Sequence, residues 1–236
     1  MVNSLQQVLV VGASTSIGNA VLSRFAARGA RLLATGRSVE QVSCAGADLT
    51  LASLDLLDTA SLDRFANITV PCFGKLDVIV FLTGVLPGKS LADYEDDLIQ
   101  EVMSVNFSSQ AALLRRLLPH LNSNSQLIMV SSISAERGSF DPIYAASKAA
   151  QIAFVKSLAT WMAPNVRVNA IAPGLIQNSG MFLAMKAERQ KHHILHTPTQ
   201  RLTTGEEIAG VITSICEPEW SNLNGQVIRI NGGSHV

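Results

Sequence analysis

Tyr144 and Lys148 are four positions apart, in a segment whose apolar residues recur at helical spacing toward Trp161. On a helix the two side chains lie on one face, one turn from each other. A tyrosine hydroxyl ordinarily titrates near ~10, and a lysine ammonium one turn away favours the phenolate and lowers that pKa. We therefore expect the pair to pass a proton to or from a substrate oxygen. An isolated match of this kind also fits an amphipathic helix with one surface lysine, so the interpretation depends on the rest of the chain.

Short apolar runs alternate with helical patterns, which is the arrangement of a doubly wound parallel α/β sheet with helices on both faces. About seven strands are predicted, at residues 8–11, 31–35, 53–56, 76–82, 126–130, 166–171 and 225–233. Helices are predicted at 17–28, 59–67 with Thr59 as N-cap, 93–105, 107–121, 144–161 and 205–216, the last capped by Thr203 or Thr204. Since there is no long linker or repeat, residues 1–236 are predicted to form a single domain.

Composition limits the classes of function. Apolar residues are 47% of the chain, charged residues are 15%, and the formal net charge is zero, so no nucleic-acid partner is expected. The three cysteines are scattered and have no metal or disulfide spacing. The N-terminus lacks a basic leader pattern and no apolar run is long enough to span a membrane. A cytoplasmic protein without a membrane or metal partner is expected.

A turn of small residues follows the first predicted strand, from Gly12 to Gly18. Strand, small-residue turn and helix is the architecture of a dinucleotide-phosphate site, because glycines admit the pyrophosphate and the helix N-terminus offers free N–H groups. The expected contacts are Gly12, Ser14, Ser16, Ile17 and Gly18. An ordinary strand–helix turn fits the same residues.

The end of the second predicted strand bears on the choice of cofactor. An acidic residue there would bind the ribose 2′-hydroxyl of NAD, but the residues present are Gly36, Arg37 and Ser38. The Arg37 guanidinium suits a 2′-phosphate and Ser38 can add a hydrogen bond. NADP(H) is therefore predicted in preference to NAD(H), although Arg37 also fits a surface loop.

Tyr144-Ala-Ala-Ser-Lys148 is preceded by Val105-Asn106 and Ser131-Ser132, and Val168-Asn-Ala-Ile-Ala-Pro-Gly174 follows. In this order the motifs resemble the short-chain dehydrogenase/reductase family, from residue 8 to residue 233. The resemblance implies hydride transfer between a nicotinamide and a carbonyl or secondary-alcohol carbon.

The same resemblance implies a role for each of four catalytic residues. Tyr144 is the general acid and base, Ser132 orients the substrate oxygen, Lys148 binds the nicotinamide ribose, and Asn106 completes a proton relay. Ser132 is preferred to Ser131 because it lies twelve residues before Tyr144 and six before Gly138, close to the family spacing.

Further cofactor contacts follow from the resemblance: Asp55 with Leu56 at the adenine, Gly84 at the ribose, Pro173, Gly174 and Ile176 at the nicotinamide, and Tyr144 and Lys148 themselves. The chain departs from the family pattern at Ser16, which replaces a glycine, and at Phe81-Leu82, which replaces two asparagines that support the sheet and the site. The threonine usual after Ile176 is also missing, and Asn178 or Ser179 could replace it.

Residues 175–200 are expected to cover the substrate, with an adaptable apolar wall of methionine and phenylalanine; its histidines are assigned no chemistry. The default substrate is a 3-oxoacyl thioester, and Lys186, Arg189 and Lys191 are the only candidates there for a basic patch. A homotetramer or dimer is expected through the helices at 107–121 and 144–161. Two alternatives remain open: a nucleotide-binding sensor without turnover, and a structural subunit of a hetero-oligomer.

Overall fold

A computed structural model describes residues 6–40 and 42–236. Its centre is one seven-stranded sheet in the order β3-β2-β1-β4-β5-β6-β7, in which every pairing is parallel. The predicted doubly wound α/β fold is confirmed. The strands are β1 Gln7–Val11, β2 Arg31–Gly36, β3 Leu49–Ser53, β4 Leu76–Phe81, β5 Leu121–Val130, β6 Val166–Pro173 and β7 Val227–Ile230.

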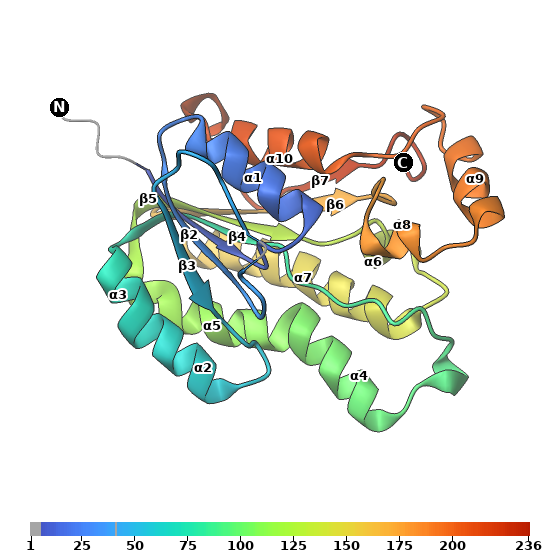
Figure 1. Cartoon of the computed structure of the whole chain (residues 1–236), viewed down its shortest axis with the longest axis horizontal. Coiled ribbons are helices and arrows are strands. Elements are labelled where there is room, and N and C mark those ends of the chain that lie inside the picture. Colours follow the sequence, from blue (N-terminus) through green and yellow to red (C-terminus); the bar gives the residue numbers. More distant parts are fainter. Residues whose placement is uncertain (1–5, 41) are drawn as a thin grey trace.

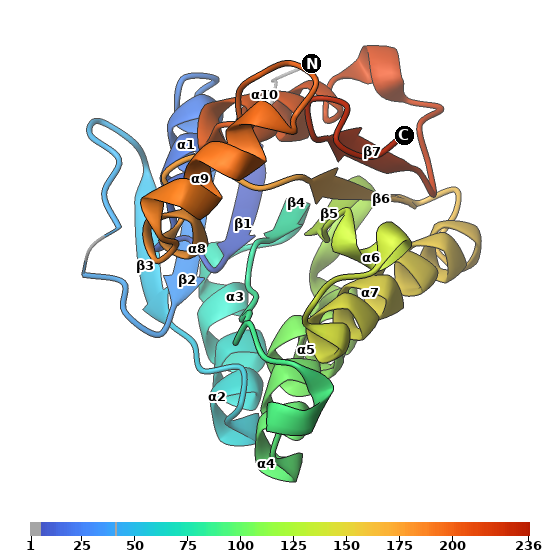
Figure 2. The same ribbon diagram turned by 90° about the vertical axis from the view of Figure 1, so that its right-hand side faces the viewer.

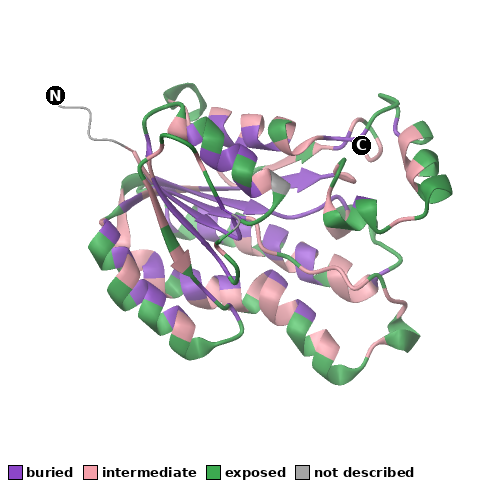
Figure 3. Cartoon of the chain, viewed as in Figure 1, coloured by how far each residue is buried: buried purple, intermediate pink, exposed green. Residues whose placement is uncertain are grey.

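Helices cover both faces of the sheet (Figure 1). One face carries α1 Ser16–Ala26 and α10 Gly205–Ser214, which pack on each other. The other carries α2 Thr59–Arg64, α3 Val70–Phe73, α4 Asp96–Met103, α5 Ser109–Leu117 and α7 Pro142–Trp161. Successive strand residues point to opposite faces, so Val8 and Val10 join the first core and Leu9 and Val11 join the second. Figure 3 shows the sheet as the most continuously buried layer.

The strand order reverses between β1 and β4, and that reversal determines where a ligand can bind. The chain runs outward from β1 to β3 and then returns to β4 on the other side of β1. In open α/β sheets the crevice at such a switch point, at the carboxyl ends of the strands, is the usual ligand site. Figure 2 shows this edge, with α6 Ser134–Arg137, α8 Gly180–Leu183 and α9 Ala187–Leu195 around it.

The third strand and the following cap were predicted a few residues too late. The strand was expected at residues 53–56 because Leu54 and Leu56 are apolar, but β3 ends at Ser53 and these two leucines are buried in the loop after it. As an edge strand, β3 has no fully buried residue and so leaves a weak apolar signal. The cap of α2 is Asp58, whose carboxylate accepts the Ala60 N–H at 2.9 Å, while Thr59 is the first helical residue.

The helix that follows Asn106 was predicted too long at both ends. Residues 104–108 form a single π-helical turn (η3 Ser104–Ser108) between α4 and α5. The chain then leaves the helix after Leu117, and Leu121 already begins β5. At the last helix the cap is Thr204, which forms a reciprocal capping box with Glu207.

Candidate active site

Helix α7 presents Tyr144 and Lys148 at the carboxyl edge of the sheet. It begins at Pro142, after Asp141 in an extended conformation, and the Asp141 carboxylate accepts the Tyr144 N–H at 2.9 Å. Pro at the first helical position is favourable because its missing N–H would have no helical partner. One turn on, Lys148 is 4% exposed and donates from Nζ to the Val130 carbonyl at 3.0 Å. Its Nζ lies 6.0 Å from the centre of the Tyr144 ring.

The two adjacent serines at the end of β5 differ in their partners. Ser131 Oγ donates to the Lys148 carbonyl at 2.9 Å, so its hydroxyl is tied to the backbone of α7. Ser132 lies beside Tyr144, where its hydroxyl favours the phenolate, and accepts the Ser134 N–H at 3.1 Å. Of the two hydroxyls, the one on Ser132 is therefore beside the tyrosine, as the spacing predicted.

Asn106 lies in the π-helical turn and is fully buried. Its side-chain amide bonds both backbone groups of Val85, accepting from the N–H at 2.7 Å and donating to the carbonyl at 2.9 Å. It also donates to Ser147 Oγ at 2.9 Å. Asn106 thus connects the loop after β4 to the helix that carries Tyr144, and all four predicted catalytic residues converge at one place.

Two buried glutamines complete this region and were missed by the sequence analysis. Gln151 Nε2 donates to the Asn106 carbonyl at 2.8 Å and to Gln110 Oε1 at 2.9 Å. Gln110 Nε2 in turn donates to the Thr83 hydroxyl at 2.9 Å. Spacing could have identified both glutamines, since Gln110 lies one turn after Asn106 and Gln151 one turn after Lys148.

The glutamine network also explains how the chain tolerates the loss of the two asparagines that the family pattern has at positions 81 and 82. Gln110 Nε2 reaches the Thr83 carbonyl at 3.1 Å and the Val105 carbonyl at 2.9 Å. The polar support that a β4-end asparagine would provide therefore comes from a helix instead.

Burial dominates the electrostatics of the tyrosine and the lysine. The pKa of Tyr144 is raised, mainly by burial; the hydrogen bond with Ser132 opposes this rise and the charge of Asp141 adds to it. Burial lowers the pKa of Lys148 to about 7. The prediction that Lys148 lowers the pKa of Tyr144 is therefore wrong for the protein alone. With a pKa of about 7 the lysine is only about half-protonated near neutral pH, and its Nζ is turned to the Val130 carbonyl.

The turn between β1 and α1 is shaped for close approach of a ligand. Gly12 has φ of +87°, and a Cβ there would lie 2.6 Å from Thr83 Cγ2. A Cβ at Gly18 would overlap the Ala13 carbonyl. Thr15 caps α1 by accepting the Gly18 N–H at 3.1 Å, Ser16 begins the helix, and its first turn carries no acidic residue. Ser14 is exposed and Ile17 half-buried. A pyrophosphate fits such a cradle, because nothing anionic opposes it.

The ends of β2 and β3 lie side by side and carry the residues predicted for the adenosine end. Gly36 pairs with Ser53 across the two strands. Arg37 and Ser38 follow Gly36 and are exposed, and Arg37 makes no ion pair with any residue that the structure describes. Asp55 is exposed, with Oδ1 accepting the Leu57 N–H at 2.9 Å, and Leu56 is buried.

The residues predicted for the nicotinamide end lie beside Lys148 and along the end of β6. A Cβ at Gly84 would lie 3.1 Å from Lys148 Nζ, so the glycine keeps that approach open. Pro173 ends β6, Gly174 donates to the Ile230 carbonyl at 2.9 Å, and Ile176 bridges to Thr203. Ser179 caps α8 by accepting the Phe182 N–H, and Asn178 has φ of +60°.

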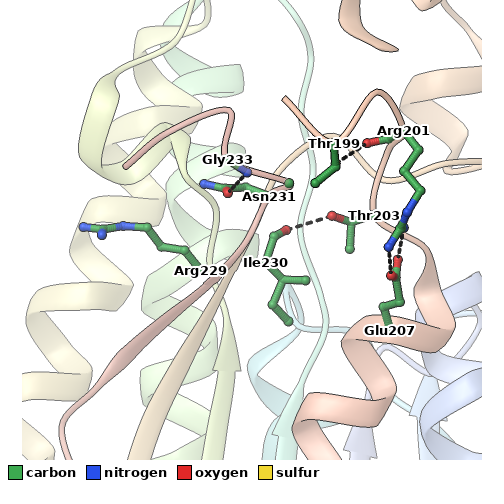
Figure 4. A pocket seen from close by; sticks show the side chains of 9 residues that line it. Thr199, Arg201, Thr203, Glu207, Arg229, Ile230, Asn231 and Gly233 are labelled. Atoms are coloured by element: carbon green, nitrogen blue, oxygen red, sulfur yellow. Dashed lines mark hydrogen bonds and ion pairs between the residues drawn. The ribbon is translucent and has the colours of Figure 1, made fainter. Parts of the chain in front are cut away.

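The segment 175–200 is anchored where it rejoins the sheet. Thr203 donates from Oγ to the Ile230 carbonyl at 2.9 Å, and Arg201 pairs with Glu207 at 2.6 Å. These residues line a polar hollow at the end of β7 that contains none of the four predicted catalytic residues (Figure 4). On α9, the rings of His192 and His196 stack at 3.8 Å. No group of metal-ligating side chains occurs among the residues that the structure describes.

The comparisons with known proteins agree with this geometry. A family model described as "Enoyl-(Acyl carrier protein) reductase" matches residues 12–235. The fold, this match and the relatives identify the chain as an oxidoreductase of the short-chain dehydrogenase/reductase family, of the 3-oxoacyl reductase type. Members of this family use a nicotinamide cofactor.

Individual relatives align over nearly the whole chain. It is 32% identical over 244 residues to the granaticin polyketide synthase putative ketoacyl reductase 2 of Streptomyces violaceoruber, covering 97% of this chain and 95% of the relative. It is 29% identical over 236 residues to the 3-oxoacyl-(acyl-carrier-protein) reductase FabG of Salmonella typhimurium, covering 97% and 96%. A short-chain dehydrogenase/reductase structure from Brucella melitensis superposes with a TM-score of 0.91 at 27% identity, covering 98% and 97%. Within the described residues, no helix is both long and apolar enough to cross a membrane.

Proposed function

We propose that this chain is an NADP-dependent reductase that transfers a hydride between the nicotinamide and a carbonyl or secondary-alcohol carbon. The position of the Ser132 hydroxyl beside Tyr144, with Lys148 buried one helical turn away, carries the proposal. The hydroxyls of Ser132 and Tyr144 can together hold one substrate oxygen. A protein that only binds a nucleotide does not need such a pair.

Each of the four residues has a role in reduction. Tyr144 donates a proton to the substrate oxygen, and its raised pKa keeps that proton in place until the oxygen gains negative charge. Ser132 hydrogen-bonds and orients the same oxygen. Lys148 binds the ribose hydroxyls of the nicotinamide. Asn106 completes the relay that returns a proton to Tyr144. The cofactor supplies the hydride, and the protein supplies position and electrostatics.

The preference for NADP rests on Arg37. Its guanidinium is exposed at the end of β2 and makes no ion pair within the described chain, so it is available for a 2′-phosphate. Ser38 adds a hydroxyl beside it. The other proposed cofactor contacts run along the carboxyl edge of the sheet: Gly12, Ser14, Ser16, Ile17, Gly18, Asp55, Leu56, Gly84, Pro173, Gly174 and Ile176.

A 3-oxoacyl thioester is the proposed substrate class. The granaticin and FabG relatives are named as ketoacyl reductases, whereas the family model is described as an enoyl reductase. Ketone reduction creates charge on an oxygen, where Ser132 and Tyr144 can act directly. We therefore expect NADPH oxidation with acetoacetyl thioester and little with crotonyl thioester.

The first experiment is a titration with NADPH and with NADH, followed by nicotinamide fluorescence. Arg37→Ala should weaken NADPH binding by about tenfold or more, because a charge-assisted contact is lost, and leave NADH binding nearly unchanged. The control is Arg115→Ala, an exposed arginine on α5. Equal binding of both cofactors by the unaltered protein would refute the NADP preference.

The alternatives have their own outcomes in the same experiments. Tight NADPH binding without turnover of any carbonyl substrate would favour the nucleotide-binding sensor. Activity that appears only when a homologous chain is co-expressed would favour the structural subunit. We also propose a homotetramer or dimer through α5 and α7, which sedimentation of the purified protein would test.

A further inference from the structure

Asp141 is a buried carboxylate that the proposed chemistry does not use. It is 1% exposed and lies directly before α7. Besides capping Tyr144, its Oδ2 accepts the backbone N–H groups of Gly88 at 2.9 Å and Lys89 at 3.3 Å. The Tyr94 hydroxyl donates to the same carboxylate, at 2.7 Å from Oδ1 and 2.9 Å from Oδ2.

A helix cap needs only one of these contacts. The others attach the loop that follows β4 to the first turn of the helix that carries Tyr144. This loop passes Lys148 at Gly84, and Asn106 holds it at Val85. Residues 85–94 are therefore fixed at one end by the Asn106 amide and farther along by Asp141.

We propose that Asp141 is a positioning residue whose carboxylate clips residues 88–94 to the start of the Tyr144 helix, so that this loop forms one wall of the substrate site, with Tyr94 as its latch. The assignment of that wall rests on the proposed function. The clip itself is a property of the fold and is testable without a substrate.

The clip also places a negative charge beside the tyrosine. The charged and titratable groups that face this region are Asp141 and Tyr94 from one side and Lys148 from the other, and the Ser132 hydroxyl lies beside Tyr144. The ammonium of Lys89 points elsewhere, to the Asp93 carbonyl at 3.2 Å. A carboxylate near a phenol disfavours the phenolate, so Asp141 raises the pKa of Tyr144.

The chain offers a direct spectroscopic test because it contains only two tyrosines, Tyr94 and Tyr144. In Tyr94→Phe, phenolate absorbance reports Tyr144 alone. Adding Asp141→Asn, or Asp141→Ser, should move the titration of Tyr144 to lower pH. Serine keeps a side-chain oxygen for the helix cap but is too short to hold the loop.

Amide hydrogen exchange at residues 88 and 89 tests the clip itself. We expect Asp141→Ser to reduce their protection at least about tenfold, Asp141→Asn to reduce it less, and Tyr94→Phe to reduce it least. With an acetoacetyl thioester, Asp141→Ser should raise KM about tenfold and change kcat less. The matched control is Asp58→Asn, which alters the exposed cap of α2 and should change none of these measurements.

The outcomes distinguish failure of the clip from failure of the proposed reductase activity. Lost amide protection at residues 88 and 89, together with a titration of Tyr144 at lower pH, supports the clip even if no substrate is turned over. Unchanged protection and an unchanged titration in Asp141→Ser overturn it, even if the protein is an active reductase. If Asp141→Ser does not fold, Asp141→Asn in the Tyr94→Phe background takes its place. The amide protection of residues 88 and 89 and the titration of Tyr144 in that double variant then decide the question.

Discussion

Replacing Lys148 with methionine should stabilise the protein below neutral pH while removing its activity. Lys148 is 4% exposed, and burial lowers its pKa from 10.5 to about 7. The folded protein therefore holds fewer protons than the unfolded chain between these two pH values. By linkage, the free energy of unfolding rises as pH rises through this window, and the full penalty of the buried ammonium applies below it.

The size of the effect follows from the two pKa values. Between pH 6.5 and 9.5 the lysine of the folded protein loses its proton, and that of the unfolded chain keeps most of its own. At 1.36 kcal/mol per pH unit, the wild-type protein should gain up to about 3 kcal/mol relative to Lys148→Met over this interval, and a gain of ~1–3 is expected because the surroundings of a buried charge relax. The hydrogen bond to the Val130 carbonyl affects both pH values similarly, because a neutral amine also donates.

The assay is urea unfolding of both proteins at the two pH values, so that all other titrating groups cancel in the difference. Lys156→Met is the matched control: this lysine is on the same helix but exposed, and its effect should be independent of pH. A stability difference between wild type and Lys148→Met that stays constant within about 0.5 kcal/mol would refute the reasoning, because it would show that the ammonium is not desolvated.

Three further predictions test the site. Tyr144→Phe should lower kcat by about 10²–10⁴ and leave NADPH binding within about threefold, as measured by turnover and by nicotinamide fluorescence. Gln151→Leu leaves the Asn106 carbonyl and Gln110 Oε1 without their donor, so thermal unfolding should show that the free energy of unfolding falls by about 1–4 kcal/mol. The loss is partly offset because Gln151 Oε1 is itself buried without a partner. An unchanged free energy of unfolding would mean that water replaces the amide. Gly18→Ala should destabilise the first turn by ~1–3 kcal/mol and weaken NADPH binding, because its Cβ would overlap a backbone carbonyl; unchanged binding would contradict the proposed cradle.

The sheet was predictable because its central strands are buried on both faces. The run from Leu76 to Phe81 is almost wholly apolar, and β4 has these bounds. Edge strand β3 was misplaced for the opposite reason, since its side chains are only partly buried and the nearest strong apolar signal, Leu54 and Leu56, belongs to the loop behind it.

The arrangement of the site was predictable where it depends on spacing along one element. The four-residue interval in α7 brought Lys148 and Tyr144 to one side, and the serine interval selected the hydroxyl that lies beside Tyr144. Charge states were not predictable in this way. Whether Lys148 carries its proton depends on how completely other elements bury it, and burial of a single lysine is a property of the whole fold.

The departures from the family pattern have to be considered together with residues far away in the sequence. Phe81-Leu82 in place of two asparagines indicates a weakened site when it is considered alone. In the fold, Gln110 reaches across to the Thr83 carbonyl and hydroxyl, and Gln151 joins that amide to the Asn106 carbonyl. Within this buried network only Gln151 Oε1 lacks a hydrogen-bond partner, and the satisfied groups rigidify their surroundings. The loss at β4 is thus offset by two glutamines, each placed one helical turn from a proposed catalytic residue. This favours a site that keeps its geometry over one that only binds a nucleotide.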